Sequence, residues 1–294
     1  MSSENLRGIG LMVLSMALFA LEDVFLKLAA AHMPTGQLVL LSGLLGMPVF
    51  ILITWRAGGR TLSPRLGHPA VLARNLGEMV GTVGYITALA SVPLATVSAV
   101  LQALPLAVTL IAALFMNEPV GWRRWSAIMV GFCGVLLVIR PGMEGFEPAA
   151  LWVLLCVAGL VVRDLGTRFI PPDCSTAQVS AWGLGSVALL GLGMIWVQGA
   201  TTLPDQSMIL PVIGAALFGT GGYAAVVAAT RHGDVAVVSP FRYARLVFAV
   251  VLAALVFREF PDSITWTGAA LIVLSGLYSF ARERRRKAAL SIGG

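Results

Sequence analysis

Long apolar runs, separated by short breaks rich in polar residues, glycine and proline, make up the whole chain. The first run spans 8–21 and the last spans 264–280. A helix needs about 20 mostly apolar residues to cross a bilayer. Nine breaks separate ten such runs, at 32–36, 56–68, 91–93, 117–124, 140–147, 169–175, 198–207, 231–234 and 258–263. The pattern therefore predicts ten membrane-spanning helices joined by short loops, without a separate soluble domain.

The composition agrees with this pattern. Of the 294 residues, 58% are hydrophobic and only 12% are charged, whereas about a quarter of the residues in a soluble domain are charged. The formal net charge of +6 would suit nucleic-acid binding only if basic stripes lay on polar surfaces. Here the basic residues lie in loops and in one tail, so we expect a lipid bilayer, and no nucleic acid, as the partner.

The Lys and Arg residues of the loops are divided unequally between the two sides of the predicted bundle. With a cytoplasmic N-terminus, Arg140 and Arg258 lie on the outer side. Thirteen lie on the cytoplasmic side, namely Arg7, Arg56, Arg60, Arg65, Arg123, Arg124, Arg168, Arg231, Arg282, Arg284, Arg285, Arg286 and Lys287. Because cytoplasmic loops carry the excess of Lys and Arg, both termini are predicted to be cytoplasmic in a multi-pass membrane protein.

The two halves of the sequence repeat each other at an offset of 141 residues. Asp23 and Lys27 in the first half match Asp164 and Arg168 in the second. Further matches at this offset join Thr35, Gln37, Val97, Ser98, Glu118 and Trp125 to Thr176, Gln178, Val238, Ser239, Glu259 and Trp266, and 81–85 matches 219–223 at an offset of 138. We interpret 1–143 as one five-helix repeat and 144–294 as a second repeat that ends in a basic cytoplasmic tail.

Five spans per repeat is an odd number, so the second repeat enters the membrane in the opposite orientation. Inverted repeats of this kind are typical of secondary transporters, whose substrate sites lie near the bilayer midplane where the repeats meet. The predicted fold is therefore an all-α membrane protein, with ten transmembrane helices in a 5+5 inverted-topology repeat around a central cavity.

This layout resembles a known superfamily of transporters. Two sets of five spans, short loops, Glu118 and Glu259 after spans 4 and 9, and a basic C-terminal tail are together similar to the EamA-type branch of the drug/metabolite transporters. Within that branch the chain resembles YddG-type amino-acid exporters. The resemblance implies that spans 1–4 and 6–9 surround the cavity, that spans 5 and 10 are peripheral, and that amino acids and related metabolites are exported across the inner membrane. Glu22-Asp23 stands in one half where Arg163-Asp164 stands in the other, so the two faces of the cavity are chemically unequal.

Glu78 is a candidate substrate ligand because it lies near the middle of the third span. Ionisable residues inside a span are costly, and they usually face a bundle interior or water. Gly81 and Tyr85 follow within two turns, on or near the same helical face. Glu78 is expected either to bind a substrate ammonium or a proton, or to pair with a buried arginine; the sequence favours neither.

The ninth span contributes a second set of candidates, on the basis of its arginines. Arg245 lies deeper than Arg242, and its forked donors suit a carboxylate; a buried ion pair is the equal alternative. Gln102 precedes the helix-breaking Pro105 and matches Tyr243 in the repeat, which favours either a site element or an ordinary kink. Tyr85, Tyr223 and Tyr243 lie deep in their spans beside Gly or Arg, and we expect them to line the cavity.

Two acid-then-base pairs stand at repeat-related positions. Asp23 with Lys27, and Asp164 with Arg168, are spaced i, i+4 and can simply neutralise each other along one helix. Inverted symmetry would place one pair toward each mouth of the cavity, so the sharper hypothesis is that these residues, with Arg163, act as alternating gates.

Together these features predict a secondary transporter that exports amino acids, including aromatic and other neutral or charged ones, and related small metabolites by alternating access. The alternative cargoes are nucleotide sugars, sugar phosphates or lipophilic cations, and a passive channel is a further option. Enzymatic activity is not expected, because His32, His68 and His232 all lie in loops. Cys133, Cys156 and Cys174 lack metal-ligand spacing, so no metal and no cofactor is predicted. We expect a monomer or a weak dimer.

Overall fold

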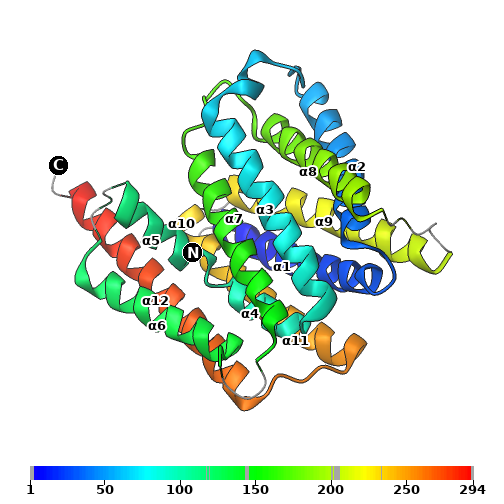
Figure 1. Cartoon of the computed structure of the whole chain (residues 1–294). Helices are drawn as coiled ribbons and strands as arrows, with labels where there is room; N and C mark the ends of the chain where they lie inside the picture. Colours follow the sequence, from blue (N-terminus) through cyan, green and yellow to red (C-terminus); the bar gives the residue numbers. More distant parts are fainter. Residues whose placement is uncertain are drawn as a thin grey trace. The chain divides into compact units, whose positions relative to one another are not determined.

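The computed structural model describes residues 3–116, 118, 120–142, 146–199, 201, 206–232 and 234–292. Within these residues the structure is helical, without β-strands (Figure 1). The α-helices are α1 (Ser3–Ala30), α2 (Thr35–Arg56), α3 (Pro69–Ser91), α4 (Leu94–Leu101), α5 (Leu104–Phe115), α6 (Trp122–Ile139), α7 (Leu151–Thr167), α8 (Thr176–Gln198), α9 (Gln206–His232), α10 (Val235–Val238), α11 (Ala244–Leu252) and α12 (Ser263–Ile292). Short 3-10 turns at Pro64–Gly67 (η1), Pro148–Ala150 (η2) and Ser239–Tyr243 (η3) and a π-helical turn at Ala253–Phe257 (η4) complete the list.

These helices follow the predicted spans closely. Over the described part of the chain, nine helical segments are long and apolar enough to cross a membrane. The remaining predicted span, the third, is α3, a helix of 23 residues. It lies outside this set because Arg74, Asn75 and Glu78 make it more polar. The chain is therefore an all-helical, multi-pass membrane protein. The more polar helix α3 is the one that carries the candidate substrate ligand Glu78.

Two of the predicted spans are interrupted. The fourth span breaks at Gln102, between α4 and α5, where Pro105 occupies the first turn of α5 and cannot donate a backbone hydrogen bond. The ninth span consists of α10, η3, α11 and η4, and its 3-10 turn contains Pro240. The break beside Pro105 agrees with the interruption expected there, and the ninth span is interrupted at its own proline.

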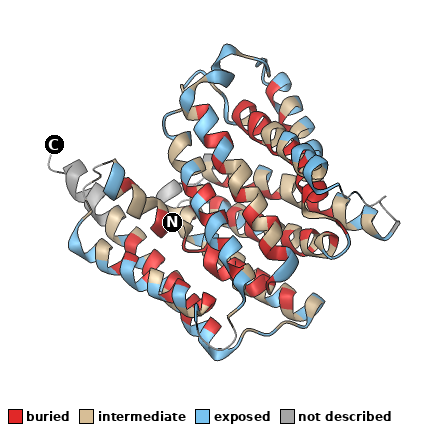
Figure 2. Ribbon diagram, viewed as in Figure 1, coloured by how far each residue is buried: buried red, intermediate tan, exposed pale blue. Residues whose placement is uncertain are grey.

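Large apolar side chains cover the outside of the helices instead of being restricted to a core. Leu189 of α8, Met129 of α6 and Leu217 of α9 are all exposed. Figure 2 shows exposed residues interspersed with buried ones along the length of the helices. Such apolar surface would be anomalous in water but is expected where lipid is the solvent.

The chain forms two compact units. Unit 1 contains Met1–Leu21, Pro93–Ala150 and Gly221–Gly294, and unit 2 contains Glu22–Val92 and Leu151–Thr220. Each unit therefore combines helices from both halves of the sequence. The boundary at 143/144 divides the two sequence repeats and remains a prediction. The compact units are a different division, which reflects how the helices pack.

Unit 2 is held together by close contacts between helices at glycines. On α3, a Cβ added at Gly77 would lie 2.6 Å from the Gly159 carbonyl oxygen of α7, and one at Gly84 would lie 2.6 Å from the Cys156 nitrogen. Gly43 of α2 meets the α8 backbone in the same way. Small residues allow this approach, which is how helices associate in lipid.

Unit 1 uses the same principle for the pair α6 and α12. A Cβ at Gly134 would lie 2.7 Å from the Gly268 carbonyl oxygen. A second cluster of buried side chains packs α1 against the C-terminal part of α9, around Met12, Met16 and Ala229. Ser15 of α1 donates a hydrogen bond to the Gly222 carbonyl at 2.7 Å.

Candidate functional site

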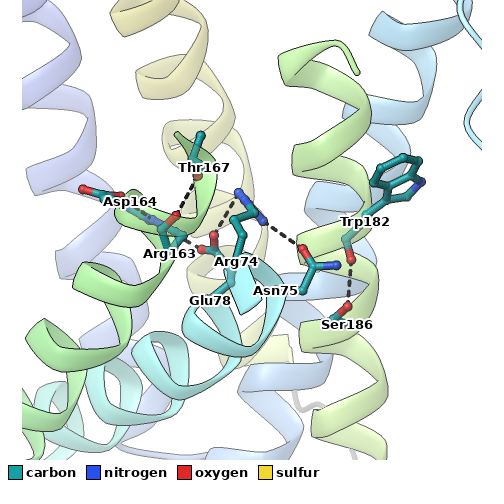
Figure 3. Close-up of polar contacts among 8 residues, drawn as sticks. All are labelled: Arg74, Asn75, Glu78, Arg163, Asp164, Thr167, Trp182 and Ser186. Carbon is teal, nitrogen blue, oxygen red and sulfur yellow. Dashed lines mark hydrogen bonds and ion pairs between the residues drawn. The ribbon is translucent and has the colours of Figure 1, made fainter. Parts of the chain in front are cut away.

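A cluster of charged side chains lies between α3 and α7 in unit 2 (Figure 3). Arg74 and Glu78 are one helical turn apart on α3, with Arg74 Nη2 3.0 Å from Glu78 Oε2. Arg163 of α7 reaches the same carboxylate, with Nη1 3.6 Å from Glu78 Oε1. Glu78 therefore pairs with two arginines, which is the ion-pair alternative left open by the sequence; its role toward a substrate stays a prediction.

Asp164 completes the cluster. Arg163 Nη2 and Nε each lie 2.9 Å from Asp164 Oδ1, and Arg74 Nη1 donates to Asn75 Oδ1 at 3.3 Å. Two guanidinium groups face two carboxylates, so the formal charge of the cluster is zero. The exposed fraction of the side chains rises across the cluster, from 11% for Arg74 to 37% for Asp164. The cluster thus has one buried end and one accessible end.

Glycines make this arrangement possible. Because Gly77 and Gly159 let the α3 and α7 backbones approach, the Arg163 side chain can reach Glu78. Gly183 of α8 leaves the space that the Arg74 guanidinium occupies, and any side chain there would collide with it. The buried charges are therefore fixed by backbone packing, which is what a preorganised polar site requires in a medium of low polarity.

Asp23, Lys27 and Tyr85 lie elsewhere in unit 2. The Tyr85 hydroxyl donates a hydrogen bond to the fully buried Asp23 carboxylate. Lys27 Nζ donates to the Val92 carbonyl at 2.7 Å, just beyond the C-terminus of α3. These two contacts connect α1 with α3 and with the turn that follows it. Arg168 is exposed at the end of α7, and the contacts of Asp164 described above are with Arg163.

The remaining predicted ligands lie in unit 1. Gln102 Nε2 donates to the Arg242 carbonyl at 3.4 Å, so the break in the fourth span contacts the break in the ninth. The Arg245 guanidinium lies over the Phe19 ring, 5.4 Å from its centroid. The Tyr243 hydroxyl is packed against Gly276 of α12, and Tyr223 is half-buried in α9.

Sequence reasoning missed three of these contacts. Arg74 as a partner of Glu78 was detectable from the i, i+4 spacing on one helix. The hydrogen bond between Tyr85 and Asp23, and the Arg163 contact to Glu78, depend on which helices pack together, and no spacing in the sequence reports this. Over the described residues, no group of three or more His, Cys, Asp and Glu side chains could hold a metal ion.

Apolar helices that hold charged side chains inside their spans are typical of membrane proteins that move polar substrates or ions. The sequence profile of the EamA-like transporter family matches this chain twice, over residues 6–140 and 148–280. The protein belongs to that family and is a transporter rather than an enzyme. The double match supports the duplication inferred from the 141-residue offset.

Several characterised transporters are similar over most of the chain. An S-adenosylmethionine uptake transporter of Rickettsia felis is 25% identical over 284 residues, which is 95% of this chain and 94% of the relative. A pseudopaline exporter of Pseudomonas aeruginosa is 26% identical over 91% of this chain and 94% of its own length. A riboflavin transporter of Brucella anthropi is 30% identical over 69% of this chain and 73% of its own length.

One crystal structure shares the fold over nearly the whole length. It superimposes with a TM-score of 0.60 at 22% sequence identity and covers 97% of this chain and 98% of its own. The helical architecture described above is therefore one that an experimentally solved protein adopts.

Proposed function

We propose that this protein exports amino acids and related small metabolites across the inner membrane by alternating access. The observation that carries the proposal is the balanced cluster of Arg74, Glu78, Arg163 and Asp164 inside the helices of unit 2. An amino acid carries one ammonium and one carboxylate. Its ammonium can replace an arginine at Glu78, and its carboxylate can replace an acidic side chain at the more accessible Arg163, because forked guanidinium donors bind carboxylates well.

The other predicted residues keep the roles proposed from the sequence. Arg245 is the proposed carboxylate ligand of unit 1, and Tyr85, Gln102, Tyr223 and Tyr243 are the other proposed substrate-binding residues. The proposed gate or ion-pair residues are Asp23, Lys27, Arg163, Asp164 and Arg168. In support of the gate hypothesis, Lys27 already binds the turn after α3 at one helix end.

The relatives support small metabolites as cargo. S-adenosylmethionine, transported by the Rickettsia relative, is itself an amino-acid derivative. The relatives include both an uptake transporter and an exporter, so export is proposed from the layout that resembles amino-acid exporters. Sugar phosphates and nucleotide sugars would favour a surplus of positive charge and lipophilic cations a lone acid, and the cluster has neither.

Counterflow in proteoliposomes tests the proposal. Vesicles loaded with one unlabelled compound would be assayed for uptake of its labelled form, using neutral, aromatic, acidic and basic amino acids, S-adenosylmethionine, riboflavin and a sugar phosphate. We expect counterflow of amino acids. A carrier that exchanges riboflavin or the sugar phosphate but neither the amino acids nor S-adenosylmethionine would contradict the proposed substrate class.

Two variants test the site. Glu78→Gln and Arg245→Ala are each expected to lower counterflow about ten- to a hundred-fold, since a hydrogen bond to a charged group contributes about 1.5–3 kcal/mol. Asp173→Asn is the matched control, because Asp173 pairs with Arg65 on the exposed surface of unit 2. Gel filtration of each variant reports folding. Normal amino-acid flux by both site variants would overturn the assignment.

A further inference from the structure

A groove of about 310 Å³ lies between α6 and α12 in unit 1. Ala127 and Ser275 form its buried floor, and the partly exposed side chains of Val130 and Tyr278 form its sides. Trp122, which is 72% exposed, stands at its end, where α6 begins. The groove is independent of the charged cluster, and the proposed transport does not use it.

The floor of the groove has no hydroxyl proton to offer a ligand. Ser126 Oγ donates to the Trp122 carbonyl at 3.0 Å, and Ser275 Oγ donates to the Ile272 carbonyl at 3.0 Å. Both serines therefore satisfy their own helices, as serines in membrane helices commonly do. The rest of the lining away from Arg123 is mainly apolar, from Ala127, Val130 and the rings of Trp122 and Tyr278, which suits a hydrocarbon chain.

The mouth of the groove is positively charged. Arg123 lies over the Trp122 ring, 5.4 Å from its centroid, and among the described side chains no carboxylate pairs with it. The next residue differs, because Arg124 Nη2 lies 3.2 Å from Glu283 Oε2. Gly121 gives the N-terminus of α6 no side-chain cap, so the positive end of the helix dipole adds to the charge of Arg123.

We propose that this groove binds an anionic phospholipid of the cytoplasmic leaflet. Its phosphate lies at Arg123, and one acyl chain runs over Ala127 and Val130. The predicted orientation places this end of α6 at the cytoplasmic surface, where the leaflet is anionic and attracts basic residues. Trp122 and Tyr278 are the amphipathic rings expected at headgroup level.

Quenching of tryptophan fluorescence by brominated lipids tests the proposal directly. The protein would be reconstituted in phosphatidylcholine vesicles that contain a minor fraction of either brominated phosphatidylglycerol or brominated phosphatidylcholine. The chain has 7 tryptophans, so the Trp122 signal is the difference between the wild type and Trp122→Phe. We expect stronger quenching of Trp122 by brominated phosphatidylglycerol, with the anionic lipid enriched about five-fold for one local arginine.

Two arginine variants separate a site from general surface charge. Arg123→Gln is expected to abolish the extra quenching. Arg56→Gln is expected to preserve it, because Arg56 is an exposed arginine predicted on the same membrane side but located on α2 of unit 2. Equal quenching by the two lipids, or loss of the difference in both variants, would overturn the proposal. So would a dimer that shields Trp122 from both lipids, because a second copy would then cover the groove.

Discussion

At the scale of the residue, Glu259 illustrates how one side chain fixes the start of a distant helix. Its Oε2 accepts a hydrogen bond from the Leu94 N–H at 2.8 Å, which is the first amide of α4. The residue before the helix is Pro93, which provides no side-chain cap. A carboxylate at a helix N-terminus satisfies an unpaired amide and interacts favourably with the dipole.

Replacing Glu259 by Ala should therefore lower the stability of unit 1. Loss of a capping side chain costs about 1 kcal/mol, and Glu259→Gln should cost less because the amide oxygen can still accept. Thermal unfolding in detergent, followed by tryptophan fluorescence, measures both. Glu147→Ala at an exposed position is the control, and an unfolding temperature for Glu259→Ala equal to that of the control would show that the cap is dispensable.

Glu78 shows which parts of the site could be predicted from the sequence and which could not. Its place in a span identified it as a candidate, and the spacing from Arg74 was visible. Its contact with Arg163 was not, because it arises from the approach of α3 to α7 at Gly77 and Gly159. At an offset of 141 the second half has Arg163 where the first has Glu22, and the Glu22 carboxylate lies beside Gly219, so the repeat alone does not report the contacts of these charges.

At the scale of the element, α6 and α12 are joined at one end by a polar clamp. Arg140 follows α6 in the left-handed conformation, at a φ of 55°, and its guanidinium binds the Asp262 carboxylate and donates to Thr265 Oγ1 at 3.1 Å. Asp262 also accepts from the Thr265 N–H at 2.9 Å, and so caps α12. The hydrogen bonds from Arg140 and Thr265 hold the pKa of Asp262 well below its usual value of 3.8.

This shift gives the clamp a defined pH dependence. A carboxyl whose pKa is lower in the folded state stabilises that state fully above its unfolded pKa, and loses the effect as the pH falls through the folded value. The difference in unfolding temperature between the wild type and Asp262→Asn should therefore be constant from about pH 8 to 5 and shrink below about pH 4. A difference that disappears between pH 7 and 5 would contradict the assignment to Asp262.

The elements themselves were largely predictable, for a physical reason. In lipid a helix must satisfy its own backbone, so span length and apolar composition determine where helices begin and end. The breaks near Pro105 and Pro240 follow from the missing proline N–H. The π-helical turn at Ala253–Phe257 has no such local signal, since no proline or polar residue interrupts the apolar run there.

At the scale of the whole molecule, the chain passes between its two units at four places. Two of these places are loops or helix ends, after Val92 and after Ala150, and two lie inside long helices, after Leu21 in α1 and after Thr220 in α9. The crossing in α9 falls within Gly219-Thr220-Gly221-Gly222. If the protein works by the proposed alternating access, we expect α9 to adapt at this crossing while its backbone remains hydrogen-bonded.

Gly221→Ala tests this requirement without a steric conflict. A Cβ at Gly221 would meet only Leu18 Cδ1, at an ordinary 3.6 Å, and Ala favours a regular helix over Gly by about 1 kcal/mol. If bending at Gly221 accompanies each transport cycle, turnover in proteoliposomes should fall about five-fold while the unfolding temperature stays equal or rises. Gly193→Ala is the matched control, because Gly193 lies in α8 within unit 2 and has open space at its Cβ. Equal turnover in the two variants would mean that the units rearrange without any adaptation of α9 at Gly221.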